Sequence, residues 1–271
     1  MDRPPQPAAP IDPAPTEAAF VARLEDATIN AFPSTHLTLD RRWLSRLTPG
    51  HDAKRINSFC VLDAGDDADL EARLERIVAD CARLGAVPTL RRTPLTPPAL
   101  DALLDRLGWS RFDETAVMRA DLMMPHVAIE APTHALEILR ATGAERGAWA
   151  DILVELGGEH AENRDLLAAI LARIVPEAVL AVAQVDGAPV AAALVVRDGD
   201  LVGLFEVVTH AEVRGQGFGA ALIAGILGFG RATGARHAWL QVKAVNPAVR
   251  LYRRLGFVEA YPYFYRRPGA A

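Results

Sequence analysis

A glycine-rich turn constrains the fold of this chain more than any other feature of its sequence. The turn reads Arg214-Gly215-Gln216-Gly217-Phe218-Gly219, and it joins an apolar segment to a stretch with helical spacing. Glycines let a ligand approach the main chain closely, and the first turn of a helix presents N–H groups that have no partner within the helix. Residues 213–258 contain seven Lys or Arg and no Asp or Glu, although the whole chain has a net charge of −5. This pattern predicts an anion-binding site at a strand–turn–helix junction.

Hydrophobic periodicity before the turn predicts antiparallel strands. Three apolar runs cover residues 180–185, 190–196 and 201–208, and an Asp-Gly dipeptide separates each run from the next. Asp-Gly between apolar runs is typical of tight β-hairpins. We therefore expect three consecutive antiparallel strands, the last of which leads into the glycine turn.

The segment after the turn predicts a helix and then a parallel strand. Apolar residues recur at helical spacing over 218–233, and a second apolar run covers 238–243. Glycine inside a helix costs about 1 kcal/mol relative to alanine. We expect this cost to be tolerated because Gly225, Gly228 and Gly230 lie close against a sheet.

The first half of the chain contains a weaker copy of the same pattern. Leu107-Gly108-Trp109 ends a helical segment in the way that Leu255-Gly256-Phe257 does, and residues 70–84 have the spacing of an amphipathic helix. The glycine turn is replaced by four acidic residues, which would repel phosphate: Asp63, Asp66, Asp67 and Asp69. The copy is therefore expected in the architecture and not in the chemistry, and the alternative is an unrelated α+β domain.

These observations predict three regions. Residues 1–15 are rich in Pro and Ala and are expected to form a disordered tail. Residues 16–125 are expected to form an N-terminal domain that has lost the anion site. Residues 126–271 are expected to form the domain that binds the ligand.

Composition argues against several other classes of protein. The sequence pI of about 5.8 argues against general nucleic-acid binding, and no apolar run is long enough to span a bilayer. The first residues lack the apolar core of a secretory signal, so a cytoplasmic location is expected. Cys60 and Cys81 are too far apart for a CxxC metal site and are expected to be buried thiols. We predict no metal, no nucleic acid and no membrane partner, and either a monomer or a homodimer.

Three kinds of phosphate ligand compete for the glycine turn. A nucleoside triphosphate loop requires GxxxxGK[ST], and no such Lys and Ser/Thr follow here. A dinucleotide fold requires an acid about 20 residues further on, where Arg236 and His237 stand instead. Coenzyme A carries a pyrophosphate and a ribose phosphate, which need basic neighbours, so the composition of this segment favours coenzyme A.

Two motifs together resemble the GNAT superfamily of N-acetyltransferases. Residues 214–219 match that superfamily's R/Q-x-x-G-x-G/A loop, and residues 246–257 are similar to its N-x-x-A-x-x-L-Y-x-x-x-G-F motif. The matching span runs from about residue 134 to 267, with one departure at Val249, where the superfamily has Ala. The resemblance implies an α+β fold with a GNAT-like central mixed sheet flanked by helices, in two tandem copies.

The resemblance also implies a reaction. An N-acetyltransferase of this kind transfers the acetyl group of acetyl-CoA to a primary amine by direct attack within a ternary complex. The acceptor would be a small-molecule amine or a peptide. Coenzyme-binding roles carry over to the loop, to the end of the preceding strand and to the start of the second motif: Val207, Val208, Arg214, Gly215, Gln216, Gly217, Phe218, Gly219, Ala220 and Asn246.

Catalytic roles are expected for Tyr252 and Glu206. The resemblance makes Tyr252 the general acid that protonates the departing thiolate, and a core tyrosine is the structural alternative. Glu206 is expected as the general base, and strand alternation places it on the face opposite Phe205 and Val207. The alternative for Glu206 is a solvated or ion-paired strand residue.

Other residues are candidates for the acceptor side. Glu159 and His160 follow a Gly-Gly pair and would line the entrance for the acceptor. Tyr261, Tyr263 and Tyr265 alternate in the last expected strand, where they would border the acceptor pocket or pack as strand aromatics. Two other functions stay open: a non-catalytic acyl-CoA-binding regulatory module, and a tandem acyltransferase that uses a different acyl donor.

Overall fold

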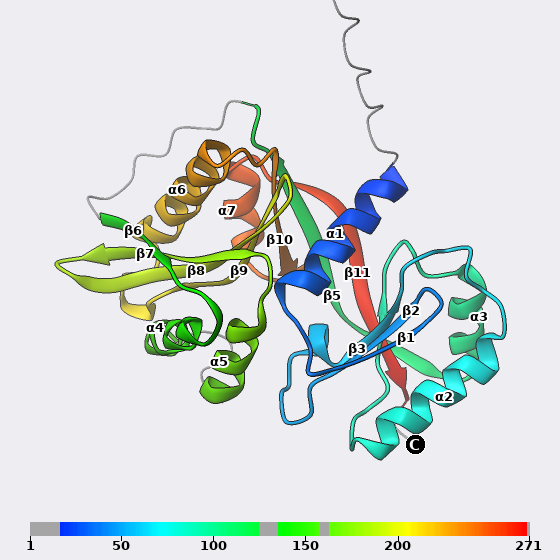
Figure 1. Cartoon of the computed structure of the whole chain (residues 1–271). Helices are drawn as coiled ribbons and strands as arrows, with labels where there is room; N and C mark the ends of the chain where they lie inside the picture. Colours follow the sequence, from blue (N-terminus) through cyan, green and yellow to red (C-terminus); the bar gives the residue numbers. More distant parts are fainter. Residues whose placement is uncertain (1–16, 125–134, 158–162, 270–271) are drawn as a thin grey trace, which may run out of the picture.

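One mixed sheet of eleven strands organises the whole chain. The computed structural model describes residues 17–124, 135–157 and 163–269 (Figure 1). We refer to residues 17–124 as the N-terminal half and to residues 135–269 as the C-terminal half. Helices lie on both faces of the sheet, so the predicted α+β class with a central mixed sheet is confirmed.

Strands and helices alternate irregularly along both halves. The N-terminal half contains α1 (Glu17–Ala31), β1 (His36–Asp40), β2 (Trp43–Leu47), η1 (Lys54–Ile56), β3 (Ser58–Val61), α2 (Leu70–Arg83), β4 (Leu90–Arg92), α3 (Pro98–Arg106) and β5 (Trp109–Asp121). The C-terminal half contains β6 (Ala135–Arg140), η2 (Gly143–Ala148), α4 (Trp149–Glu155), α5 (Arg164–Arg173), β7 (Glu177–Val185), β8 (Ala188–Asp198), β9 (Leu201–Thr209), η4 (Ala211–Val213), α6 (Phe218–Ala232), β10 (His237–Lys243), α7 (Ala248–Arg254) and β11 (Val258–Pro268).

The two halves repeat one order of strand pairing. Strands β1, β2 and β3 pair antiparallel, and β3 then pairs parallel with β4 across the helix α2. Strands β7, β8 and β9 also pair antiparallel, and β9 pairs parallel with β10 across α6. This repeat supports the tandem arrangement. The boundaries 16–125 and 126–271 stay a prediction.

The last strand of each half pairs with the other half. The order of the sheet is β1-β2-β3-β4-β11-β5-β10-β9-β8-β7-β6, so β5 lies beside β10 and β11 lies beside β4. Between them, β5 and β11 pair antiparallel along most of their length. The two halves therefore share one continuous sheet and do not close separate ones.

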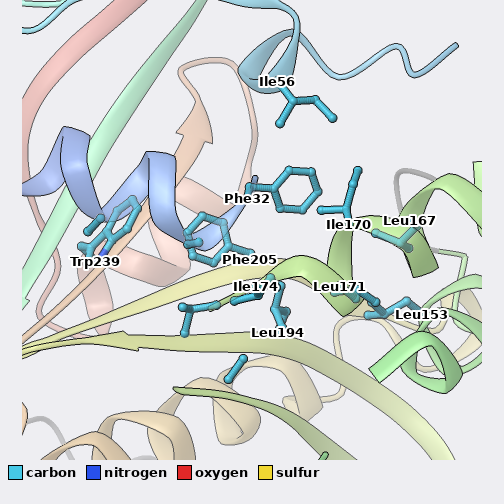
Figure 2. Close-up of a cluster of buried hydrophobic side chains, with 14 of the residues drawn as sticks. Phe32, Ile56, Leu153, Leu167, Ile170, Leu171, Ile174, Leu194, Phe205 and Trp239 are labelled. Carbon is cyan, nitrogen blue, oxygen red and sulfur yellow. The ribbon is translucent and has the colours of Figure 1, made fainter. Parts of the chain in front are cut away.

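Helices bury three apolar clusters against this sheet. Helices α6 and α7 cover one face of the C-terminal strands, and α1, α4 and α5 cover the other face (Figure 1). Figure 2 shows the cluster beneath α1, α4 and α5. In it, Phe32 and Ile56 of the N-terminal half lie with Phe205 and Ile170 of the C-terminal half. Burial of large apolar side chains contributes about 1.5–3 kcal/mol each, so this cluster helps to join the halves.

A buried ion pair crosses the shared part of the sheet. The Arg91 guanidinium of β4 donates to both carboxylate oxygens of Glu25 in α1, at 2.8 and 3.0 Å. Tyr261 Oη of β11 donates to the same carboxylate at 2.6 Å. Burial raises the pKa of Glu25, but the charge and hydrogen bonds of Arg91 and the Tyr261 hydrogen bond outweigh it and hold that pKa below its usual range. The three side chains thus form a satisfied polar network across α1, β4 and β11.

Most element predictions for the second half are confirmed. The three antiparallel strands, the helix over 218–233 and the parallel strand over 238–243 are present within one to three residues of the expected bounds. Cys60 and Cys81 are buried, and burial raises the pKa of the Cys60 thiol to about 12. The tail expected over 1–15 lies outside the described residues.

The three glycines in the interior of α6 differ in how closely their neighbours pack against them. A Cβ at Gly225 would lie 2.3 Å from Leu136 Cδ2, and a Cβ at Gly230 would lie 3.2 Å from Leu122 Cδ1. At Gly228 a Cβ would have nothing within 4 Å. The predicted close packing is therefore correct for Gly225 and Gly230 and wrong for Gly228, because Gly228 lies on the outer side of the helix.

Replacing Glu25 by Gln should lower the free energy of unfolding by about 3–5 kcal/mol, because the Arg91 guanidinium would remain buried without its counter-charge. Urea unfolding at neutral pH measures the change. Glu71→Gln is the matched control, since Glu71 pairs with Arg106 at the surface and its side chain is 71% exposed. A Glu25→Gln midpoint equal to that of the control would contradict a stabilising role for the buried pair.

Candidate active site

Strands β9 and β10 diverge and open a pocket in the sheet. Their parallel pairing runs from Leu201–His237 to Leu204–Leu240, and beyond it β9 continues to Thr209 while β10 continues to Lys243. The pocket beside this divergence has a volume of about 860 Å³. Seven of the residues expected to bind the coenzyme or to act in catalysis line it: Glu206, Val207, Val208, Arg214, Gly219, Asn246 and Tyr252.

The glycine loop ends at the first turn of α6. Gly217 is the N-cap residue and has a left-handed backbone with φ 92°, a conformation that glycine adopts without strain. A Cβ at Gly219 would lie 2.9 Å from Thr209 Oγ1, so this position also excludes larger residues. Arg214 Nε donates to Thr209 O at 3.1 Å and joins the loop to the end of β9. The amides of the first helical turn have no acceptor within the helix, which makes this end of α6 suited to an anion.

The remaining residues of the glycine loop present their backbone amides, and not their side chains, as the groups expected to bind a ligand. Phe218 is buried in the cluster beneath α6 and Ala220 is also buried, while Gly215 and Gln216 are exposed. The Gln216 side chain donates to Glu212 O at 3.4 Å. The coenzyme roles expected for these residues rest on their backbone amides and stay predictions.

A β-bulge in β9 places Glu206. Between the pairs Ala192–Val208 and Leu194–Phe205, β9 has two residues where β8 has one. Glu206 has a left-handed backbone with φ 49°, which costs a non-glycine residue about 1–3 kcal/mol. Such strain is found most often at functional sites.

The bulge also corrects the expected side-chain alternation. Phe205 packs in the cluster beneath α1, and Glu206 pairs with Arg55, whose guanidinium lies over the Phe32 ring of that same cluster. Val207 packs in the opposite cluster. Glu206 therefore lies opposite Val207, as expected, but on the same side as Phe205, because the extra residue shifts the alternation by one.

Tyr252 reaches the pocket from α7. Its side chain is 7% exposed, and its ring packs edge to face against Phe257 with the centroids 5.9 Å apart. Burial raises the pKa of Tyr252 to about 12. The hydroxyl is therefore protonated at neutral and mildly alkaline pH, the state that a proton donor requires.

Asn246 has a structural role at the start of α7. Its Oδ1 accepts from the Ala248 amide at 2.9 Å, and its own amide donates to Lys243 O at 2.8 Å. These bonds link the end of β10 to α7 beside the pocket. The side chain has a capping role, and the coenzyme role expected for Asn246 stays a prediction.

The N-terminal half supplies one wall of the same pocket. Residues 52–55, Asp113 and Thr115 line it, and Lys54 Nζ lies 2.8 Å from Asp113 Oδ2. None of these residues was expected in the site. No local motif marks them, because only the exchange of β5 and β11 brings them beside β9.

The expected acceptor-side residues have different outcomes. Tyr263 and Tyr265 line the pocket, whereas Tyr261 is buried away from it against Glu25. Tyr263 Oη donates to Gln241 Oε1 at 2.9 Å, and its ring lies under the Arg91 guanidinium, 3.5 Å from the centroid. Glu159 and His160 lie outside the described residues.

The acidic loop of the N-terminal half, residues 63–69, binds an arginine side chain from the helix that follows it. Arg73 of α2 donates to both carboxylate oxygens of Asp66 at 2.9 Å, and its guanidinium lies 4.4 Å from the Trp43 ring centroid. These contacts support the prediction that this loop does not hold phosphate.

Within 17–124, 135–157 and 163–269 no group of three or more metal-ligating side chains is found. Nor does any helix among those residues have the length and apolarity to span a bilayer.

Comparison with solved structures identifies the fold. A GCN5-related N-acetyltransferase from Kribbella flavida superposes with a TM-score of 0.68 at 20% identity, over 92% of this chain and 96% of its own. A tandem GNAT protein from the clavulanic acid biosynthesis pathway superposes with a TM-score of 0.61 at 17% identity, over 92% and 88% of the two chains. A GCN5-related N-acetyltransferase from Sphaerobacter thermophilus gives 0.56 at 20% identity, over 79% and 74%.

Sequence comparison identifies the family. No curated protein sequence matches the chain. The sequence model of the family described as "Probable histone acetyltransferase Rv0428c C-terminal" matches residues 18–266, a span that covers nearly all of both halves. The chain therefore belongs to this acetyltransferase family and has the fold of the GNAT N-acetyltransferases.

Proposed function

We propose that this protein is an N-acetyltransferase that transfers the acetyl group of acetyl-CoA to a primary amine, by direct attack within a ternary complex. The observation that carries the proposal is one pocket that combines the N-terminal end of α6, the diverging edge of β9 and the Tyr252 side chain. The acceptor would be a small molecule or a peptide. The reaction needs no metal ion, and we expect it to take place in the cytoplasm.

The pyrophosphate would bind the loop from Arg214 to Ala220. Its backbone amides and the helix dipole favour an anion, and Lys243 adds a positive charge at the pocket wall. The pantetheine arm would lie in the opening between β9 and β10, along the main chain of Val207 and Val208, and Asn246 would offer a side-chain donor. Gly219 lets the start of α6 lie close to the end of β9, because a Cβ at this position would lie 2.9 Å from Thr209 Oγ1.

The chemistry moves one proton from nitrogen to sulfur. The amine nitrogen attacks the thioester carbonyl carbon and forms the C–N bond, and the C–S bond breaks. Glu206 accepts the proton that the amine loses, and Tyr252 donates a proton to the departing thiolate. The products are the N-acetylated amine and CoA with a free thiol, and solvent returns both residues to their starting states.

An acceptor screen tests the proposal. Release of free CoA thiol is followed with a thiol-reactive dye, with acetyl-CoA as donor and spermidine, glucosamine, L-lysine and a lysine-containing peptide as acceptors. Turnover with any of these amines supports the proposal. Binding of acetyl-CoA without turnover would favour a regulatory acyl-CoA-binding module, and stronger thermal stabilisation by a longer acyl-CoA would favour a different donor.

Replacing Gly217 by Asp should weaken acetyl-CoA binding at least about tenfold more than replacing it by Asn, because only Asp adds a negative charge where the pyrophosphate would lie. Asp and Asn are alike in size, and both tolerate the left-handed backbone of this position. Calorimetric titration measures the affinities, and thermal unfolding checks that the two variants are equally folded. Equal affinity for the two variants would argue against a phosphate at this loop.

Replacing Tyr252 by Phe should lower kcat by about 10²–10⁴-fold and leave the affinity for acetyl-CoA nearly unchanged, because only the proton donor is removed. Tyr261→Phe is the matched control. It also removes one hydroxyl from a buried tyrosine, but Tyr261 contacts Glu25 and does not line the pocket. A kcat for Tyr252→Phe equal to that of the control would remove Tyr252 from the mechanism.

A further inference from the structure

Residues 52–55 of the N-terminal half line the same pocket as Arg214 and Gly219 of the glycine loop. They include the first two residues of η1, which precedes β3, and they come close to β9 because the two halves share one sheet. Lys54 is held by Asp113 of β5, with Nζ 2.8 Å from Oδ2. This wall is therefore fixed to the strand that pairs with β10, next to the diverging strands.

Arg55 is the residue of this wall that contacts the proposed base. Its guanidinium forms an ion pair with the Glu206 carboxylate, and the two side chains are 17% and 2% exposed. The same guanidinium lies over the Phe32 ring, with Cζ 4.0 Å from the centroid. The aromatic ring and the carboxylate together leave the guanidinium little freedom, because a planar cation stacked on a ring has a fixed direction for its donors.

Glu206 needs such a partner because of where it lies. It stands in the bulge of β9 with a left-handed backbone, so the regular strand does not direct its side chain. A glutamate side chain has three rotatable bonds, and a misplacement of about 1 Å at a reacting group lowers the rate by about 10²-fold. A fixed contact on the carboxylate determines where the base meets the acceptor amine.

We propose that Arg55 is a positioning residue for the acetyl transfer, which holds the Glu206 carboxylate toward the acceptor across the interface between the two halves. The proposal rests on the function proposed above, with Glu206 as the base. It gives the N-terminal half a part in the reaction, although its own counterpart of the glycine loop is filled by Arg73 and Asp66.

The test uses the full chain with Arg55→Met, Arg55→Lys, Glu206→Gln and the double variant Arg55→Met/Glu206→Gln. Met keeps the length of the side chain and an apolar contact with Phe32 but removes the charge and the donors. We expect Arg55→Met to lower kcat by about 10–100-fold, with KM for acetyl-CoA within about threefold of wild type. Arg55→Lys, which keeps the charge, should restore part of the loss. The amine with the highest turnover in the acceptor screen serves as the probe.

The double variant separates positioning from a general structural role. If Arg55 acts through Glu206, adding Arg55→Met to Glu206→Gln should lower kcat by no more than about twofold further. Arg23→Met is the matched control, because Arg23 of α1 pairs with Asp200 of the C-terminal half outside the pocket. Its kcat should equal that of wild type.

Two results would overturn the role of Arg55. One is a wild-type kcat for Arg55→Met, and the other is a full additional loss in the double variant. Either result, obtained with an active wild-type enzyme and a Glu206→Gln variant whose kcat is lowered but still measurable, would leave the proposed function in place. A wild-type protein that binds acetyl-CoA but acetylates none of the amines would overturn the proposed function and the role of Arg55 together.

Discussion

Strands β5 and β11 lie antiparallel in the middle of the sheet, and each pairs on its outer side with a strand of the other half. This exchange means that β4 and β10 have their backbone groups satisfied only when both halves are present. The Glu25–Arg91 pair and the Tyr261 hydroxyl cross the same region from three elements. The exchange of β5 and β11 also brings the N-terminal half against β9. It therefore places residues 52–55 at the wall of the pocket and Phe32 and Ile56 in the shared apolar cluster.

The pocket depends on that shared sheet in a second way. Strand β10 leaves β9 after Leu240 and stays paired with β5, a strand of the N-terminal half. The bulge at Glu206 bends β9 in the same region. An opening between two strands exposes backbone polar groups, which is unfavourable unless a ligand or water satisfies them. A coenzyme arm with amide groups suits this opening, and the end of α6 lies beside it to receive the phosphates.

The sequence was most informative where local chemistry decides the structure. The glycine turn, the Asp-Gly hairpins and the helix over 218–233 follow from backbone freedom and periodicity, and all of them are present. The family also followed, because two motifs at the right separation are specific. The exchange of β5 and β11 was not predictable, since strand order depends on pairing between distant segments. For the same reason Arg55 and Asp113 were missed, and the bulge that moves Glu206 gives no signal in a run of apolar residues.

The most direct test of the account is a crystal structure of the full chain with CoA. The pyrophosphate should contact the backbone amides between Arg214 and Ala220, with the pantetheine arm between β9 and β10. The sulfur should then lie within hydrogen-bond reach of Tyr252 Oη and on the side of the pocket where Glu206 meets Arg55. A coenzyme bound away from the start of α6, or with its sulfur remote from both residues, would contradict the account.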